Sequence, residues 1–161
     1  MTDTFPPSDR DVARIRAAVP ADAGRLHLLT LPFMRAGFLR HRHPTVFGER
    51  VADFLVAEHD ERLVACAGVQ QLADQSTAAV LYSFCVDETY QRRGIGAQLM
   101  ADSVQHARAG GARRLYTATI RRDGWFERFA FRRVERADAP ASWAARLSPS
   151  RSSLLYVRDL A

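Results

Sequence analysis

The chain has 161 residues, of which 47% are hydrophobic and 25% are charged, a composition that suits one globular domain and excludes a disordered chain. All 23 basic residues are arginines, and the net charge is +5. Because the arginines are scattered and often neighbour acidic residues, this charge does not favour nucleic acid over a small polyanion as partner. No apolar run approaches the roughly 18 residues of a membrane span, so we expect no membrane association.

Residues 1–13 are polar and contain prolines, without the apolar core of a secretion signal, and we expect a flexible leader before a domain over 14–161. Cys66 and Cys85 each lie within an apolar run, which indicates buried thiols of a reducing compartment and disfavours a disulfide or a nucleophile. We therefore expect a cytoplasmic protein. His41 and His43 lack further metal-ligating neighbours, so no metal site is expected.

The hydrophobic pattern alternates between strand-like and helix-like segments along the chain. Asp22 is of a type that caps helices, and Gly110-Gly111 is typical of a helix end. The pattern predicts, in chain order, a strand at 15–19, a helix from 20 to about 33, a helix at 45–51, a hairpin of two strands turning at 59–62, a strand at 78–86, a helix at 95–109, a strand at 114–120, a short helix from 124, a strand at 131–134, a helical turn at 142–147 and a strand at 152–158. This order favours a mixed sheet in a single α/β domain.

The loop between strand 78–86 and helix 95–109 reads Gln91-Arg92-Arg93-Gly94-Ile95-Gly96. Several backbone N–H groups gather there at a helix N-terminus, and the glycines let a phosphate approach closely. The two arginines add positive charge at the same place. The spacing excludes both the P-loop and the dinucleotide-binding glycine pattern. A pyrophosphate cradle is one interpretation, and a glycine-containing turn with solvated arginines is the other.

The same stretch resembles motif A of the GCN5-related N-acetyltransferases. The match runs over Phe84-Cys85-Val86-Asp87 and then over 91–97, QRRGIGA. Two further segments are similar to the family's motifs: 125–131, WFERFAF, after the next strand, and 15–22, IRAAVPAD, at the first strand and helix start. Together they cover about residues 14–135 in the family's order. On this basis the chain is identified as a member of that family.

The resemblance implies the fold and the reaction. The expected fold has a central mixed sheet of six to seven strands with a V-shaped splay, flanked by about four helices. The expected activity is transfer of an acetyl group from acetyl-CoA directly to the primary amine of a small molecule within a ternary complex. Many members of the family are homodimers, but no segment of this chain indicates an interface.

The resemblance also assigns coenzyme A contacts residue by residue. The strand before the loop would pair with the pantetheine arm, in the way that a sheet edge binds an added strand. The loop amides would hold the pyrophosphate, and the acyl thioester would lie where two strands part. The residues assigned in this way are Phe84, Cys85, Val86, Gln91, Arg92, Arg93, Gly94, Ile95, Gly96, Ala97, Thr119, Phe126 and Arg128.

Two departures from the family pattern concern proton transfer. Phe126 stands where many members have a tyrosine that protonates the departing thiolate. The segment 79–82 contains no glutamate that could serve as a base, so Tyr82 is the nearest polar candidate for a catalytic residue. Tyr82 could contact substrate or relay a proton through water, or it could simply pack against a sheet face.

The acceptor is suggested by a narrower resemblance. The sequence is similar to short bacterial N-acetylglutamate synthase-like acetyltransferases in 36–44, 53–58 and 125–128, and to amino acid-analogue N-acetyltransferases in 136–140 and 152–158. Both groups acetylate an amine on a compound with a carboxylate, which Arg35, Arg40 and Arg42 could bind. These arginines could equally be solvated surface charges. A larger acyl donor, a carrier protein or another macromolecular partner, and a non-catalytic coenzyme A-binding module all remain alternatives.

Overall fold

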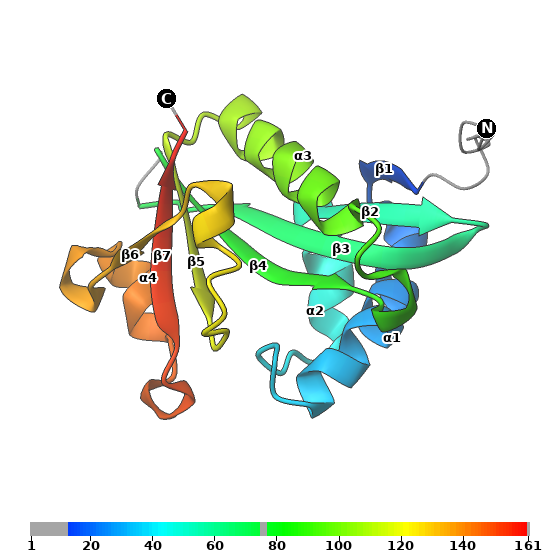
Figure 1. The fold of residues 1–161 in the computed structure, drawn as a ribbon, viewed down its shortest axis with the longest axis horizontal. Coiled ribbons are helices and arrows are strands. Elements are labelled where there is room, and N and C mark those ends of the chain that lie inside the picture. The colour runs from blue at the N-terminus through cyan, green and yellow to red at the C-terminus, as the bar shows by residue number, and fades with distance from the viewer. Residues whose placement is uncertain (1–12, 75–76, 161) are drawn as a thin grey trace, which may run out of the picture.

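A computed structural model describes residues 13–74 and 77–160 of the chain. Its strands form one seven-stranded sheet in the order β1-β2-β3-β4-β5-β7-β6, drawn in Figure 1. The strands are β1 (Arg14–Ala17), β2 (Phe54–His59), β3 (Arg62–Gln71), β4 (Ala78–Val86), β5 (Arg114–Thr119), β6 (Arg132–Val134) and β7 (Leu154–Asp159). β4 and β5 are parallel, and the other neighbouring pairs are antiparallel. The prediction of a mixed sheet of six to seven strands is confirmed.

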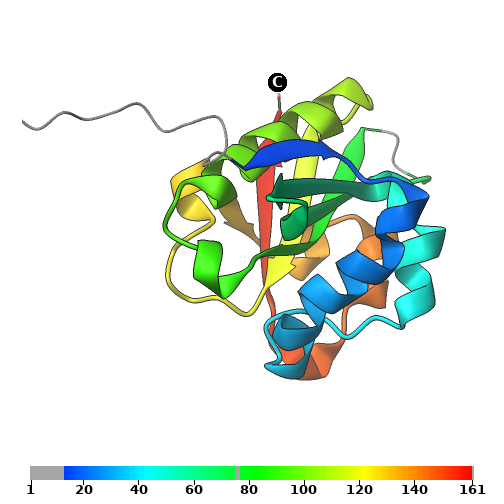
Figure 2. The same cartoon turned by 90° about the vertical axis from the view of Figure 1, so that its right-hand side faces the viewer.

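Helices cover both faces of the sheet. α3 (Ile95–Ala109) packs on one face, and α1 (Ala23–Arg35), α2 (Pro44–Glu49) and α4 (Ala141–Arg146) lie on the other, as Figures 1 and 2 show. The helices close three apolar clusters, of which α1 and α2 share one. The α3 cluster includes Leu99, Met100 and Leu115, the α1–α2 cluster includes Leu26, Phe47 and Phe54, and the α4 cluster includes Tyr116, Trp143 and Val157.

The helix α3 matches its prediction at both ends. Its residues Leu99, Met100 and Val104 are buried against the sheet, as their helical spacing predicts. At its C-terminus Gly111 adopts φ +94°, and Ala112 N–H donates to the Ala107 carbonyl at 3.0 Å. This left-handed glycine is the reason the helix stops there.

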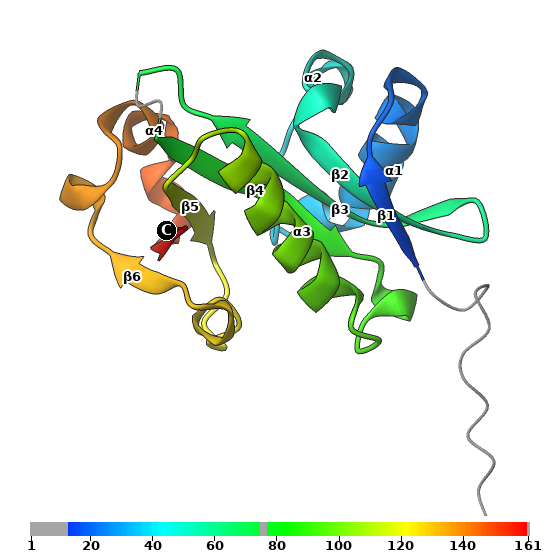
Figure 3. The same cartoon turned by 90° about the horizontal axis from the view of Figure 1, so that it is seen from above.

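The pairing between β4 and β5 ends about half-way along β4. Their ladder pairs Ala78 to Leu81 with residues 114–117 and goes no further. At the last pair the Thr117 hydroxyl donates to the Leu81 carbonyl at 2.9 Å. On its other side β4 bulges against β3, where the register shifts and Ser83 adopts φ +50°. The two strands then diverge, visibly in Figures 1 and 3, and leave one edge of β4 open. This is the predicted splay.

Several predicted boundaries were wrong by a few residues. The strand at 15–19 is β1, two residues shorter at its C-terminal end, and the segment from Pro20 to Asp22 is a 3-10 turn before α1. Asp22 makes no side-chain cap on α1. Its carboxylate accepts instead from Val19 N–H at 2.8 Å and from Arg16 at 2.7 Å. Asp22 therefore caps the 3-10 turn that precedes α1, through Val19, and pairs with Arg16 at the same time. The short helix expected from residue 124 is a 3-10 turn over Glu127–Phe129.

Cys66 and Cys85 are buried free thiols, with 3.8 Å between their Sγ atoms, as their apolar surroundings predict. No described helix is long and apolar enough to cross a membrane. The leader predicted over 1–13 falls almost entirely outside the described residues, and only Ala13 is seen, buried in the α3 cluster.

Candidate functional site

The loop before α3 presents unused backbone donors. None of the hydrogen bonds among the described residues uses the N–H groups of residues 92–97, and the first turn of a helix leaves such groups free by construction. Gly94 caps the helix with φ +81°, and an added Cβ there would meet only open space. The Gln91 side-chain amide donates to the Val86 carbonyl at 2.9 Å and ties the loop to β4. The converging donors and the helix dipole favour a bound anion.

Two arginine side chains add positive charge at this loop, and one of them packs against an aromatic ring. The Arg93 guanidinium lies 5.1 Å from the ring centre of Tyr90, at a distance typical of a cation–π contact. The Tyr90 ring packs in turn against His59, with 5.3 Å between ring centres. Arg92 is exposed and adopts φ +65°. The predicted cradle residues 91–97 therefore lie together at one helix end.

An aromatic side chain that we did not predict as a site residue lies beside the cradle. A Cβ on Gly96 would lie 3.6 Å from Trp125 Cζ2, and the Trp125 ring packs 5.3 Å from that of Phe84. Phe126, one of the residues that the resemblance assigned to coenzyme A, is 7% exposed and packs on Trp125, Phe131 and Tyr156. Trp125 lies in the segment 125–131 that resembles a family motif, and this position was the signal that could have identified it.

The open edge of β4 turns particular backbone groups outward. Asp87 N–H donates to the Val64 carbonyl of β3 at 2.7 Å, so Asp87 and Cys85 direct their backbone groups toward β3. Successive residues of a strand alternate, and Phe84 and Val86 therefore direct theirs toward the gap. Of the predicted pantetheine contacts, Phe84 has backbone groups directed at the gap, Val86 has a free N–H while its carbonyl accepts from Gln91, and Cys85 faces β3.

The C-terminal wall of the gap is formed by β5. Thr119 lies beyond the last residue paired with β4, and its hydroxyl accepts from Arg121 N–H at 3.0 Å. Arg128 is exposed at the turn that follows. Thr119 therefore lies on β5 beyond the point where β4 and β5 separate, and Arg128 lies in the turn after that strand.

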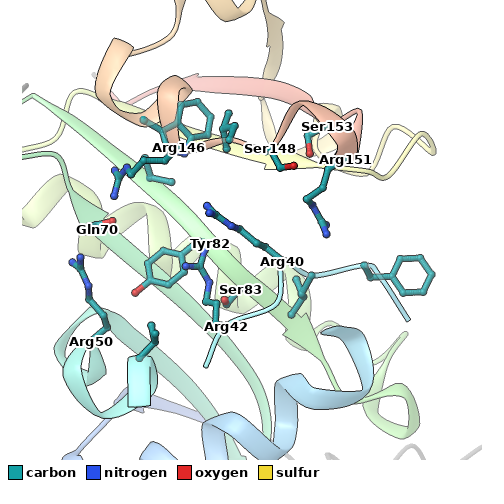
Figure 4. A pocket seen from close by; sticks show the side chains of 17 residues that line it. Arg40, Arg42, Arg50, Gln70, Tyr82, Ser83, Arg146, Ser148, Arg151 and Ser153 are labelled. Carbon is teal, nitrogen blue, oxygen red and sulfur yellow. The ribbon is translucent and has the colours of Figure 1, made fainter. Parts of the chain in front are cut away.

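A pocket of about 150 Å³ opens on the opposite face of the sheet, between the segment joining α1 to α2 and the segment around α4, as Figure 4 shows. Five arginines line it, and no lining side chain among the described residues is acidic. The other lining groups are apolar or neutral. The arginines are Arg40, Arg42, Arg50, Arg146 and Arg151. Such a wall attracts anions and repels cations.

Arg42 is the most enclosed of these cations. Its Nε is buried and has no hydrogen-bond partner among the described residues. Burial lowers the pKa of the Arg42 guanidinium, and the neighbouring charges of Arg40, Arg50 and Arg146 lower it further. A bound anion would relieve this repulsion, because a carboxylate pairs with the fork of a guanidinium.

Tyr82 forms part of the pocket wall and is half-buried. Its hydroxyl donates to Asp53 Oδ2 at 2.6 Å, and the Arg42 guanidinium lies 4.7 Å from the centre of its ring. Burial raises the pKa of the Tyr82 phenol, and the hydrogen bond to Asp53 raises it further. The hydroxyl is therefore held neutral, with its proton directed at Asp53.

The structure brings together two of the three arginines predicted for the acceptor. Arg40 and Arg42 line the pocket, whereas Arg35 is exposed near the end of α1 and is not among the lining residues. Arg50, Arg146 and Arg151 were not predicted. Arginines are so frequent in this sequence that position alone gave no signal, and only the fold brings residues 40 and 151 to one cavity.

Within residues 13–74 and 77–160, no three His, Cys, Asp or Glu side chains are grouped as a metal site would require.

Comparison with known proteins agrees with this geometry. Residues 25–131, more than half of the chain, match the family model described as the Acetyltransferase (GNAT) family. The chain belongs to the GNAT family. Its match to curated proteins includes the amino-acid acetyltransferase of Pseudomonas fluorescens strain Pf0-1, which is 30% identical over 91% of this chain. A second, from strain Pf-5, is 33% identical over 88%.

This GNAT domain spans only part of those relatives. It matches 34% and 31% of their respective lengths. Among solved structures, N-acetylglutamate synthase of Neisseria gonorrhoeae, complexed with coenzyme A and N-acetyl-glutamate, aligns with a TM-score of 0.88 and 25% identity, over 96% of this chain and 36% of the other. A GNAT-family acetyltransferase of Staphylococcus aureus aligns with a TM-score of 0.77 and 18% identity, over 93% of this chain and 100% of the other. The two proteins share the same fold.

Proposed function

We propose that this GNAT domain transfers an acetyl group from acetyl-CoA to the amine of an amino acid or a close analogue. The observation that carries the proposal is the position of two anion-attracting sites, the loop 91–97 and the arginine pocket. They lie on opposite faces of the sheet, at the gap between β4 and β5. Phe84 packs with the α3 cluster and Tyr82 with the α1–α2 cluster, so β4 separates the cradle from the arginine pocket. The relatives named amino-acid acetyltransferases, and the synthase complexed with coenzyme A and N-acetyl-glutamate, support it.

The donor fits the α3 face. Backbone N–H groups of residues 92–97 supply the fixed dipoles that a pyrophosphate needs. The open backbone groups of Phe84 offer a strand edge to the amides of pantetheine. The N–H of Val86, which also faces the gap, is available to the thioester carbonyl oxygen as negative charge develops on it. The residues present therefore suit coenzyme A, and the donor needs no side-chain nucleophile.

The acceptor fits the pocket on the other face. Arg42 and Arg40 are the cations that would hold the carboxylate, and Arg146 and Arg151 stand on the opposite wall for a second acidic group. The amine nitrogen would then bond to the acyl carbon as the carbon–sulfur bond breaks, and the thiolate would leave as coenzyme A. The small volume of the pocket favours an amino acid over a macromolecular acceptor.

Deprotonation of the acceptor follows from charge. An ammonium group cannot attack, and the described lining residues include no carboxylate that could remove its proton. Nearby positive charges disfavour the protonated form of an amine. The arginine wall therefore lowers the pKa of the bound amine, and its proton leaves through water.

We further infer that the protein acts in the cytoplasm, in keeping with its two free thiols. A homodimer, as in other members of the family, stays a prediction that light scattering of the purified protein would test.

The decisive experiment is release of coenzyme A thiol from acetyl-CoA across paired acceptors. We would compare L-glutamate with 4-aminobutyrate and L-ornithine with putrescine, because each pair differs by the α-carboxylate. If guanidinium groups bind the α-carboxylate, we expect turnover of the α-amino acid in each pair and at least tenfold lower kcat/KM for the compound that lacks the α-carboxylate. Equal rates within both pairs would contradict the assignment of the pocket.

Silence on every amino acid would overturn the proposed substrate class. If acetyl-CoA still bound, the next trials would use longer acyl-CoA donors and carrier-bound or peptide acceptors. Binding without turnover in all of these would favour the non-catalytic coenzyme A-binding module.

A further inference from the structure

The Tyr82 side chain takes an unusual course across the sheet. Gly68 of β3 is its Cα partner, and a Cβ on Gly68 would lie 2.6 Å from Tyr82 Cζ and 2.7 Å from Cε1. Such distances are shorter than any van der Waals contact. The ring therefore lies flat on β3, in space that exists only because residue 68 has no side chain.

The far end of the ring is also fixed. The hydroxyl reaches past β3 and donates to Asp53 Oδ2 at 2.6 Å. The edge of Tyr82 packs on Phe54, with 5.4 Å between ring centres and 75° between planes, a favourable geometry for aromatic pairs. Glycine below, carboxylate at the tip and phenylalanine at the side leave the ring little freedom.

The upper face of the ring supports Arg42. The guanidinium carbon lies 4.7 Å from the ring centre, and the ion pairs among the described residues include none to Arg42. Figure 4 shows Arg42 beside Tyr82 on the pocket wall. Gly68, Tyr82 and Arg42 thus form three successive layers, and the outermost one is the unpaired cation.

We propose that Tyr82 is a positioning residue, which holds the Arg42 guanidinium on the wall of the acceptor pocket through its ring face, and that Gly68 is required for this because it lets the ring lie flat. The inference rests on the proposed function, since it takes Arg42 as the contact to the acceptor carboxylate. It assigns the phenol no part in proton transfer. The hydroxyl extends across β3, away from the gap between β4 and β5 where the thioester would lie.

The layers predict a graded series of variants. Tyr82→Leu removes the ring and should raise the KM for the amino acid about tenfold, the size of a partly buried cation–π contact. Tyr82→Phe keeps the ring and loses only the bond to Asp53, so a rise of about threefold is expected. Gly68→Ala displaces the ring and should resemble Tyr82→Leu. The KM for acetyl-CoA should stay within about twofold in all three.

Gly68→Ala is tested with a matched control variant and with a double-mutant cycle. Gly24→Ala adds the same methyl group in α1, where it would meet nothing within 4 Å, and should leave both KM values unchanged. The double variant Gly68→Ala/Tyr82→Leu should be no worse than Tyr82→Leu alone, because the methyl group acts only through the ring. Additive effects would overturn the proposed role of Gly68.

A second measurement reports on Arg42 without catalysis. The ring current of Tyr82 shifts the Arg42 Nε–H resonance in a ¹H–¹⁵N spectrum, and loss of the peak in Arg42→Lys assigns it. Gly68→Ala and Tyr82→Leu should move this resonance toward the position of a solvated arginine, and Gly24→Ala should not. An unmoved resonance would show that the ring does not support Arg42 and would overturn the inference.

Calorimetric titration of L-glutamate into the protein with coenzyme A separates the two proposals. If no amino acid is turned over but L-glutamate binds, and Tyr82→Leu weakens binding about tenfold, the substrate class fails and the positioning role stands. If amino acids are turned over and Tyr82→Leu changes neither KM nor Kd, the positioning role fails alone. If neither L-glutamate nor L-ornithine binds to the unaltered protein and neither is turned over, both proposals are overturned.

Discussion

The two sides of the strand gap are built by different means. On the donor side, six consecutive residues, 92–97, supply backbone N–H groups at the start of one helix, and side chains add little to that geometry. On the acceptor side, the pocket is made by side chains from segments that lie more than a hundred residues apart in sequence. The proposed donor meets backbone N–H groups at the start of a helix, where Gly94 at φ +81° is the main demand on the sequence. The acceptor meets side chains, which can change without disturbing the sheet.

A charge placed in the cradle should have the largest effect. In Gly94→Glu a carboxylate enters the space reserved for phosphate, and the φ of +81° is unfavourable for any side chain. We expect the Kd of coenzyme A to rise by about a hundredfold or more, because like charges repel and an unpaired charge is costly to desolvate. Calorimetry with coenzyme A would measure it.

Gly24→Ala is again the suitable control for helix propensity. Unchanged affinity for coenzyme A in Gly94→Glu would mean that residues 92–97 do not hold the pyrophosphate. The conclusion that backbone groups bind the donor would then be wrong.

A change in the pocket should affect the acceptor alone. Arg42→Gln removes a bidentate, charge-assisted contact, and we expect the KM for the preferred amino acid to rise about 30-fold with little change in the KM for acetyl-CoA. Steady-state kinetics with each substrate varied in turn would separate the two constants.

Arg35→Gln provides the matched comparison, because Arg35 is exposed and outside the pocket. It should alter either KM by less than about twofold. If Arg35→Gln had the larger effect, the acceptor would bind nearer the end of α1 than the pocket does.

A substitution in the fold away from both sites should lower stability without changing the KM of either substrate. Asp22 is 2% exposed, and Arg16 foremost, then the N–H of Val19, keep the pKa of its carboxyl below the usual value. Asp22→Asn should cost about 2 kcal/mol of unfolding free energy at neutral pH and change neither KM. Urea unfolding followed by circular dichroism would measure this.

The pH dependence of that loss has a definite sign. A carboxyl whose folded pKa is depressed stabilises the fold fully above its unfolded pKa, about 3.9, and the contribution is lost as the pH falls through the lower folded pKa. The difference between the two proteins should therefore shrink below about pH 4. A difference that stayed constant down to pH 2 would mean that the Asp22 charge is not what stabilises the fold.

The sequence predicted local features well and distant ones poorly, for physical reasons. The bounds of α3 and β4 follow from residues within a few positions, namely apolar spacing and the glycines at each end of α3. The order β5-β7-β6 places the last strand between two earlier ones, which no local pattern encodes. Arg146 and Arg151 reach the pocket only because of that order.

Two site residues illustrate the same limit at shorter range. Trp125 lies against Gly96, a proximity across the fold that the sequence did not predict. The course of Tyr82 depends on the absence of a side chain at Gly68, on a neighbouring strand. Neither dependence is visible until the strands are paired.

The two tryptophans of the chain are divided between the two sides. Trp125 lies beside the cradle at Gly96, and Trp143 lines the arginine pocket, where its ring also packs on Tyr116. The protein therefore carries a separate intrinsic fluorophore for each ligand. With Trp125→Phe and Trp143→Phe variants to isolate each emission, stopped-flow fluorescence can time the arrival of donor and acceptor independently, and so establish their order of binding without any label.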